Sequence, residues 1–284
     1  MRLMLVPLLA LLATGCAESE PQTLSGDEIR AQVEHAADGD HRSAENRERN
    51  RWRNPGETMA FFGLQPHWKV VEVWPGAGWY TEVLAPVLRD RGQLVAASFP
   101  EDAEGIRGRL GREYREKLEA APDLYDRVRV VGFAPPEQNR LGEPDSADMV
   151  LLSRHFHNFI RNDVVDEVLD AAREVLRPGG VLAIIQHRAD EGAEPEADQR
   201  TGYVRETWLI QRVDEAGFAL EERSEINANP DDPRDHPEGV WTLPPTLRYC
   251  QAMEDEGERR ECESRYRAIG ESDRMTLRFV KPDP

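Results

Sequence analysis

The chain has 284 residues, of which 39% are hydrophobic, so it can hold a substantial core in one large domain or two small ones. Its 54 acidic and 36 basic residues give a formal charge of −18, so its surface repels polyanions. We therefore do not expect nucleic acid as a partner. Nothing in the sequence fixes an oligomeric state.

The first segment has the pattern of an export signal. Arg2 gives a positive start, residues 3–13 form an apolar run, and small residues lead to Cys16. The run is too short to span a bilayer as a stable helix. Small residues before a lone cysteine resemble the lipobox of bacterial lipoproteins, which implies cleavage after Gly15 and lipidation of Cys16. An ordinary secretory signal is the alternative, because Ala13 stands where the lipobox usually has Leu.

The residues after the cysteine predict where the mature chain goes. Ala17, rather than Asp, follows Cys16, which resembles lipoproteins sent to the outer membrane. We expect a periplasmic protein that meets the membrane only through its lipid. Residues 17–41 begin with a stretch rich in Glu, Ser, Pro and Gly and are predicted to be a flexible tether, followed by a domain at 42–284.

Export also decides how the other two cysteines are interpreted. In an oxidising compartment, a disulfide between Cys250 and Cys262 would close a loop of about a dozen residues and contribute on the order of 3 kcal/mol. A metal site on these cysteines would need further Cys or His ligands, and only His236 is close in sequence. We expect the disulfide.

A basic block in this acidic chain precedes the first strand. Arg42, Arg49 and Arg53 are spaced by seven and four residues, so one face of a helix would present three guanidinium groups. Two interpretations stay open. The block is either a solvated, salt-bridged helix face, or an N-terminal lid that lays arginines near a carboxylate or phosphate.

The next residues predict a cofactor cradle. A short helix over residues 55–64 precedes a strand at 69–74, which breaks at Pro75-Gly76-Ala77-Gly78 before a helix resumes at Thr81. Glycines let the backbone approach a ligand closely, and the first turn of the helix offers free N–H groups. A strand that ends in this turn would place both at one edge of a sheet.

The rest of the chain alternates between strands and helices. We predict strands at 93–98, 128–133, 147–153, 181–186, 218–226 and 275–281, and helices at 103–120, 163–176 and 204–216. This order implies an α/β fold with a mostly parallel, doubly wound sheet. Residues 227–272 would be an insertion between the last two strands.

The motifs, in this order, resemble the class I S-adenosylmethionine-dependent methyltransferases, and in particular a group of bacterial predicted methyltransferases that often carry export signals. The similarity covers roughly residues 42–282. The stretches that carry it are Arg47-Glu48-Arg49-Asn50 through Phe61-Phe62-Gly63, Glu72 through Thr81, Leu176-Arg177-Pro178-Gly179-Gly180, Ala216-Gly217-Phe218, Asn229-Pro230-Asp231-Asp232 and Leu277 through Pro282. The resemblance implies a Rossmann-like, seven-stranded sheet with an antiparallel last strand.

The resemblance also implies a cofactor, S-adenosylmethionine, and a set of residues that bind it. Glu72 would contribute negative charge near the cationic end of the cofactor. The implied cofactor-binding residues are Glu72, Pro75, Gly76, Ala77, Gly78, Tyr80, Thr81, Ser98, Ser153 and Arg154.

Two residues depart from the family pattern. Trp74 stands where the first glycine of E-x-G-x-G-x-G belongs, and Ser98 stands where a carboxylate normally binds both ribose hydroxyls. A serine cannot supply that bidentate, charge-assisted pairing, so Glu101 or Asp102 would have to reach back. A nicotinamide site fits less well, because G-x-G-x-x-G would need a third glycine where Thr81 stands.

Three histidines follow predicted strands. His155 and His157 come after the fourth strand and His187 after the fifth, at the sheet edge where open α/β folds bind ligands. Methyl transfer to a hydroxyl or ammonium group needs a base near neutral pKa, which histidine supplies. The alternative is that each histidine bonds a neighbour structurally. No carboxylate is spaced with them as a metal site would require, so we expect no metal.

The sequence therefore predicts an exported, lipid-anchored methyltransferase that acts on a small molecule. The rival interpretation is a non-catalytic ligand-binding lipoprotein with a methyltransferase-like fold. It rests on the missing ribose carboxylate and on the compartment, because S-adenosylmethionine is made in the cytosol and its permanent charge keeps it from crossing membranes unaided.

Overall fold

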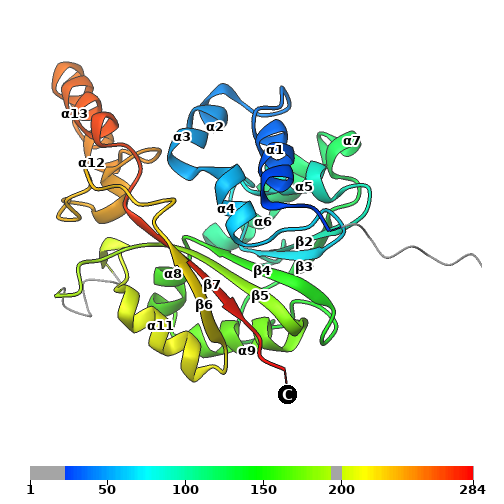
Figure 1. The fold of residues 1–284 in the computed structure, drawn as a ribbon. Helices are drawn as coiled ribbons and strands as arrows, with labels where there is room; N and C mark the ends of the chain where they lie inside the picture. Colours follow the sequence, from blue (N-terminus) through cyan, green and yellow to red (C-terminus); the bar gives the residue numbers. More distant parts are fainter. Residues whose placement is uncertain (1–22, 193–199, 284) are drawn as a thin grey trace, which may run out of the picture.

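A seven-stranded sheet organises the chain, with its strands in the order β3-β2-β1-β4-β5-β7-β6 (Figure 1). The computed structural model describes residues 23–192 and 200–283. The strands are β1 (Lys69–Val73), β2 (Gln93–Ser98), β3 (Arg129–Gly132), β4 (Ala147–Ser153), β5 (Leu176–His187), β6 (Ala219–Ser224) and β7 (Arg274–Val280). Strand β7 runs antiparallel to both β5 and β6, and the other pairings are parallel. The predicted fold class is confirmed.

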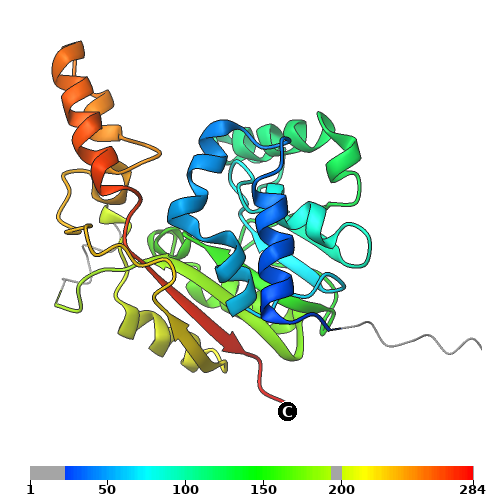
Figure 2. The ribbon, with the colours of Figure 1, turned by 45° about the horizontal axis from the view of Figure 1, so that its top comes forward.

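Helices cover both faces of the sheet (Figures 1 and 2). Each face buries its own apolar cluster, so the molecule has three layers. One layer holds α1 (Gly26–Ala37), α4 (Pro55–Phe61), α5 (Thr81–Leu88), α6 (Gly105–Glu119) and α7 (Pro122–Tyr125). The opposite layer holds α8 (Phe156–Arg161), α9 (Val165–Val175) and α11 (Glu206–Glu215). Two short helices, α2 (Ala44–Glu48) and α3 (Asn50–Arg53), lead from α1 to α4.

Helix α1 lies before the domain boundary that was predicted from the sequence. Ile29 and Val33 are fully buried against α4 and α5, and a capping box of Ser25 and Glu28 starts the helix. The predicted flexible tether is therefore wrong over this stretch, and the domain begins before residue 42. The polar composition hid a narrow apolar face at helical spacing. Cys16 and residues 17–22 lie outside the described part of the chain, and no helix within that part is long and apolar enough to span a membrane.

Strand β5 begins at Leu176, five residues before its predicted start at Val181. The Gly179 N–H donates to the carbonyl of Lys281, and the Lys281 N–H donates to that of Gly180. The segment predicted to end the preceding helix thus extends the pairing with β7, and the helix ends at Val175 instead.

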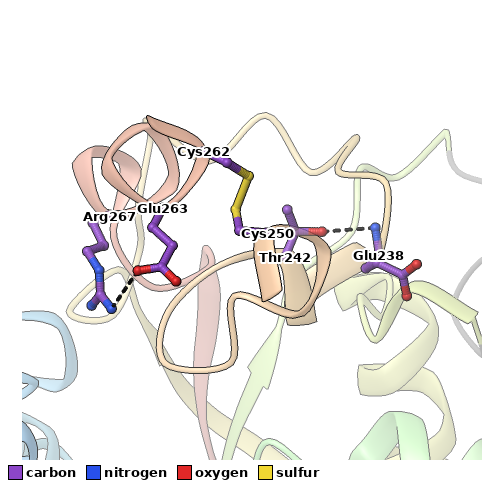
Figure 3. Close-up of a disulfide and its surroundings, with 6 residues drawn as sticks. All are labelled: Glu238, Thr242, Cys250, Cys262, Glu263 and Arg267. Atoms are coloured by element: carbon purple, nitrogen blue, oxygen red, sulfur yellow. Dashed lines mark hydrogen bonds and ion pairs between the residues drawn. A yellow bond between two sulfur atoms is a disulfide. The ribbon is translucent and has the colours of Figure 1, made fainter. Parts of the chain in front are cut away.

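The insertion between β6 and β7 forms a small unit that projects from the sheet (Figures 1 and 2). It contains a 3₁₀ helix, η1 (Gly239–Thr242), and two α-helices, α12 (Arg248–Gln251) and α13 (Glu256–Ile269). A disulfide joins Cys250 of α12 to Cys262 of α13, as Figure 3 shows. After α13 the chain returns to the sheet through residues 271–273, and β7 begins at Arg274.

Candidate functional site

A cavity of about 340 Å³ lies at the carboxyl ends of β1, β4 and β5, beside the start of β7. Strand order reverses between β1 and β4, since β2 and β3 lie to one side and β5 to the other. Open α/β sheets bind ligands at such a switch point. Helices α2 and α3 and the residues around η1 complete the walls.

The loop after β1 opens toward the cavity at one glycine only. Gly76 has φ +59°, and a Cβ placed there would meet nothing within 4 Å. Gly78 has φ +79°, but its Cβ would lie 3.3 Å from the Tyr114 ring of α6. Gly76 and Ala77 therefore form the open cradle, whereas Gly78 faces the protein.

Glu72 at the end of β1 is a buried carboxylic acid in the cavity wall. Burial raises its pKa to about 7, although the Thr81 hydroxyl donates to it at 2.6 Å. Lys117 lowers this pKa only in part. A carboxyl group in this state gains most from a cation that binds beside it.

Trp74 lines the cavity and covers the ends of two other strands. Its Nε1 donates to the carbonyl of Phe133 at 3.1 Å, and its ring centroid lies 4.8 Å from that of Phe99. Because Phe99 follows β2 and Phe133 follows β3, the indole lies over the carboxyl ends of both strands. Ser98 is buried there and does not line the cavity.

His155, His157 and His187 all line the cavity. Burial lowers the pKa of His155 to about 4 and that of His157 to about 3, and positive neighbours add to both shifts. His187 Nδ1 lies 2.5 Å from the Ser272 hydroxyl, and burial lowers its pKa well below the ordinary value. At neutral pH these imidazoles are uncharged and weakly basic, unlike the near-neutral base expected from the sequence. No group of three or more metal-ligating side chains occurs in the described ranges.

The predicted arginine face divides between two environments. Arg49 and Arg53 line the cavity and contact Glu271, which lies three residues before β7 begins at Arg274. Arg42 instead pairs with Glu82 of α5 at 3.1 Å and donates to the Ala37 carbonyl and to Asn50. Arg42 is therefore ion-paired but buried, and it precedes α2, so it is not part of a solvated helix face, whereas Arg49 and Arg53 lie at the site.

The structure brings most of the sequence-predicted site residues together. Those that line the cavity are Glu72, Pro75, Gly76, Ala77, Tyr80, Ser153, Arg154, His155, His157 and His187. Gly78, Thr81 and Ser98 lie outside it: Gly78 and Thr81 pack toward Tyr114, and Ser98 lies at the strand ends that Trp74 covers. Their predicted roles stay predictions.

Several residues that line the cavity were not among the predicted site residues. The motif at residues 47–50 was a signal for Arg49, and the arginine spacing was a signal for Arg53. No pattern pointed to Trp241, Glu271 or Ser272, because they come from the insertion and its return to the sheet.

No family model matches the sequence, and no curated protein matches it either. Solved structures do match. The chain is similar to a SAM dependent methyltransferase from Aquifex aeolicus, with TM-score 0.50 and 20% identity over 70% of this chain and 93% of that one.

The chain has the Rossmann-like methyltransferase fold. It is also similar to a protein assigned as a sarcosine dimethylglycine methyltransferase from Galdieria sulphuraria, with TM-score 0.53 and 16% identity over 81% of this chain and 88% of that one. A [4+2]-cyclase, SpnF, matches with TM-score 0.54 and 12% identity over 91% of this chain and 95% of its own. One architecture thus accompanies differently named activities, so function must be argued from the site.

Glu72→Gln should change how stability depends on pH. A pKa raised to about 7 in the folded state contributes stability at low pH that is lost as pH rises from 4.5 through 7, by up to about 3 kcal/mol. Glutamine does not ionise, so the variant should gain stability over wild type across this window. Urea unfolding at pH 5, 6, 7 and 8 measures the difference. The exposed Glu57→Gln is the control, and parallel pH profiles for wild type and Glu72→Gln would refute the assignment.

Proposed function

We propose that this protein is an S-adenosylmethionine-dependent methyltransferase that acts on a small molecule. One observation carries the proposal: in a methyltransferase fold, a buried acid and an open glycine cradle line the same cavity at the β1–β4 switch point. S-adenosylmethionine is the cofactor expected from the named activities of the neighbouring folds.

The cavity fits the methionine end of this cofactor. When bound, S-adenosylmethionine supplies a methyl group carried on a cationic sulfonium. Glu72 offers that cation a carboxylate whose pKa burial has raised, and Gly76 leaves space against the backbone. Ser153 and Arg154, after β4, would line the opposite wall.

The residues at the ends of β1 and β2 do not fit the ribose of S-adenosylmethionine. Trp74 covers the strand ends where the ribose-binding side chain would be, and Ser98 offers no carboxylate. This observation favours the second candidate function, a non-catalytic ligand-binding protein with the same fold. The two candidates differ in whether the cofactor binds at all.

The histidines would act on the other reactant. A neutral imidazole can accept a proton, but the low pKa of His155 and His157 makes the protonated form costly. Negative charge brought into the cavity would stabilise the imidazolium and raise these pKa values. Proton transfer from an acceptor is therefore favoured when the acceptor, or another ligand beside it, is anionic.

We further propose that the protein is exported and anchored through Cys16. Two sequence features support this: the apolar run before the cysteine and the small residues around it. The Cys250–Cys262 disulfide is also typical of an oxidising compartment. In that compartment the source of a cytosolic cofactor needs an explanation, which makes direct binding measurements the first experiment.

Trp74→Gly should strengthen S-adenosylmethionine binding by about tenfold. The change restores a glycine at φ +50° and opens the ends of β2 and β3 to the ribose. Calorimetry on the mature chain compares the two proteins, with thermal unfolding confirming that the variant is folded. Absence of binding at millimolar cofactor in both proteins would refute the methyltransferase proposal and leave the ligand-binding candidate. Weaker binding by the variant would show that Trp74 supports the cofactor.

Cys16→Ser should abolish lipid attachment. In cells grown with radioactive palmitate, we expect the label on the wild-type protein in the membrane fraction and no label on the variant. Label that persists on Cys16→Ser, or a wild-type protein that stays unlabelled, would contradict the anchor.

A further inference from the structure

Four arginines surround the buried carboxylate of Glu271 in the cavity wall. Glu271 accepts hydrogen bonds from Arg49 Nε at 2.8 Å, Arg53 Nε at 3.0 Å and Arg274 Nη1 at 2.9 Å. Arg154 Nη1 lies 4.0 Å from the same carboxylate. Arg49, Arg53 and Arg154 line the cavity, whereas Arg274 does not.

The charges in this cluster do not balance. Four guanidinium groups and one carboxylate leave a surplus of three positive charges, and guanidinium groups stay protonated in proteins. Burial acts to raise the pKa of Glu271, but the surrounding arginines outweigh it and hold this pKa well below the ordinary value. Among the described residues, the other carboxylic acid in the cavity wall is Glu72, whose pKa of about 7 leaves it only partly ionised at neutral pH.

Several guanidinium nitrogens in the cluster have no hydrogen-bond partner among the described residues. Arg53 is 1% exposed, yet its Nη1 and Nη2 make no hydrogen bond within the described part of the chain, and neither does Arg154 Nε. The Arg53 guanidinium is held in place by Trp79, whose ring centroid lies 4.6 Å away. Buried donors that are left unpaired are costly, and unpaired charges more so. The cluster is therefore incomplete without an anion.

Arg42 offers a comparison with an arginine outside the cavity. It also lies over the Trp79 ring, with its Cζ 4.7 Å from the centroid. Its donors, however, are taken by Glu82, Asn50 and the Ala37 carbonyl. Both arginines lie over the Trp79 ring, but only Arg53 has buried Nη atoms that make no hydrogen bond within the described residues.

We propose that the cavity binds a small molecule through a multiply charged anionic group, a phosphate or a polycarboxylate, held by Arg49, Arg53 and Arg154. Guanidinium groups pair with both kinds of oxyanion through two parallel hydrogen bonds. Anion binding follows from this chain's own residues, whereas assigning the anion to the methyl acceptor rests on the proposed function.

The cofactor itself would not balance the cluster. S-adenosylmethionine carries a sulfonium, an ammonium and a carboxylate, so its net charge is positive and its binding would enlarge the surplus. A second, anionic molecule is needed to neutralise it. This assigns the negative charge to the acceptor rather than to the methyl donor.

Thermal unfolding and calorimetry with inorganic phosphate and with citrate, without cofactor, test the proposal on the mature chain. The unfolding temperature of wild type should rise with anion concentration, because a ligand that binds only the folded state stabilises it. Whichever anion binds more tightly identifies the group. Arg154→Met should raise the dissociation constant about tenfold or more, since one charged hydrogen-bond partner is lost.

A matched control separates this site from general charge effects. Arg51 is exposed on the same helix as Arg53 and pairs with Glu48 at 3.1 Å, so Arg51→Met removes one positive charge outside the cavity. It should bind anions like wild type. Arg154→Met should fold without loss of stability in anion-free buffer, because it removes a charge that lacks a close partner.

Two outcomes would overturn the proposal. One is that neither phosphate nor citrate shifts the unfolding temperature, or that Arg154→Met binds them as wild type does. The other is that S-adenosylmethionine alone binds and loses its affinity in Arg154→Met, which would assign the arginines to the carboxylate of the cofactor. Anion binding without any cofactor binding would instead support this site while refuting the methyltransferase proposal.

Discussion

The buried ion cluster at Glu271 is the interaction on which the site depends. It joins parts of the chain that are far apart in sequence: Arg49 and Arg53 reach Glu271 across 222 and 218 residues. Neighbouring contacts reinforce the junction, since Asn54 donates to the Ile226 carbonyl and Asn227 donates to Thr58. The N-terminal helices and the start of β7 are thereby held together over the carboxyl ends of β1 and β4, and the cavity exists because that junction closes.

The cavity walls carry opposite charges from different elements. Strand β1 contributes Glu72, an acid whose pKa is raised because burial disfavours its charge. The Glu271 cluster contributes arginines with buried nitrogens that make no hydrogen bond within the described residues. Both features destabilise the protein when no ligand is bound. A cation beside Glu72 and an anion beside Arg53 and Arg154 would relieve them together, as a methyl donor and an anionic acceptor would.

The sequence predicted the sheet well because apolar strands and glycine stops are local signals. Residues that follow strands could also be placed, since carboxyl ends of parallel strands meet at one edge, and His155, His157 and His187 do meet there. Orientation could not be predicted. Only the packed structure shows that Gly78 faces Tyr114 and that the Trp74 side chain covers the ends of β2 and β3. Glu271 had no local signal for a place at the site either, because Arg49 and Arg53, which bond it there, lie more than 200 residues away.

The central claim is that the arginines that line this cavity require an anion. Anomalous diffraction from crystals soaked in selenate, a dianion shaped like phosphate, tests it most directly. We predict a selenium peak within hydrogen-bonding distance of the Arg53 and Arg154 guanidinium groups. Selenate found only on the surface, with these guanidinium groups paired to carboxylates of the protein, would contradict the claim.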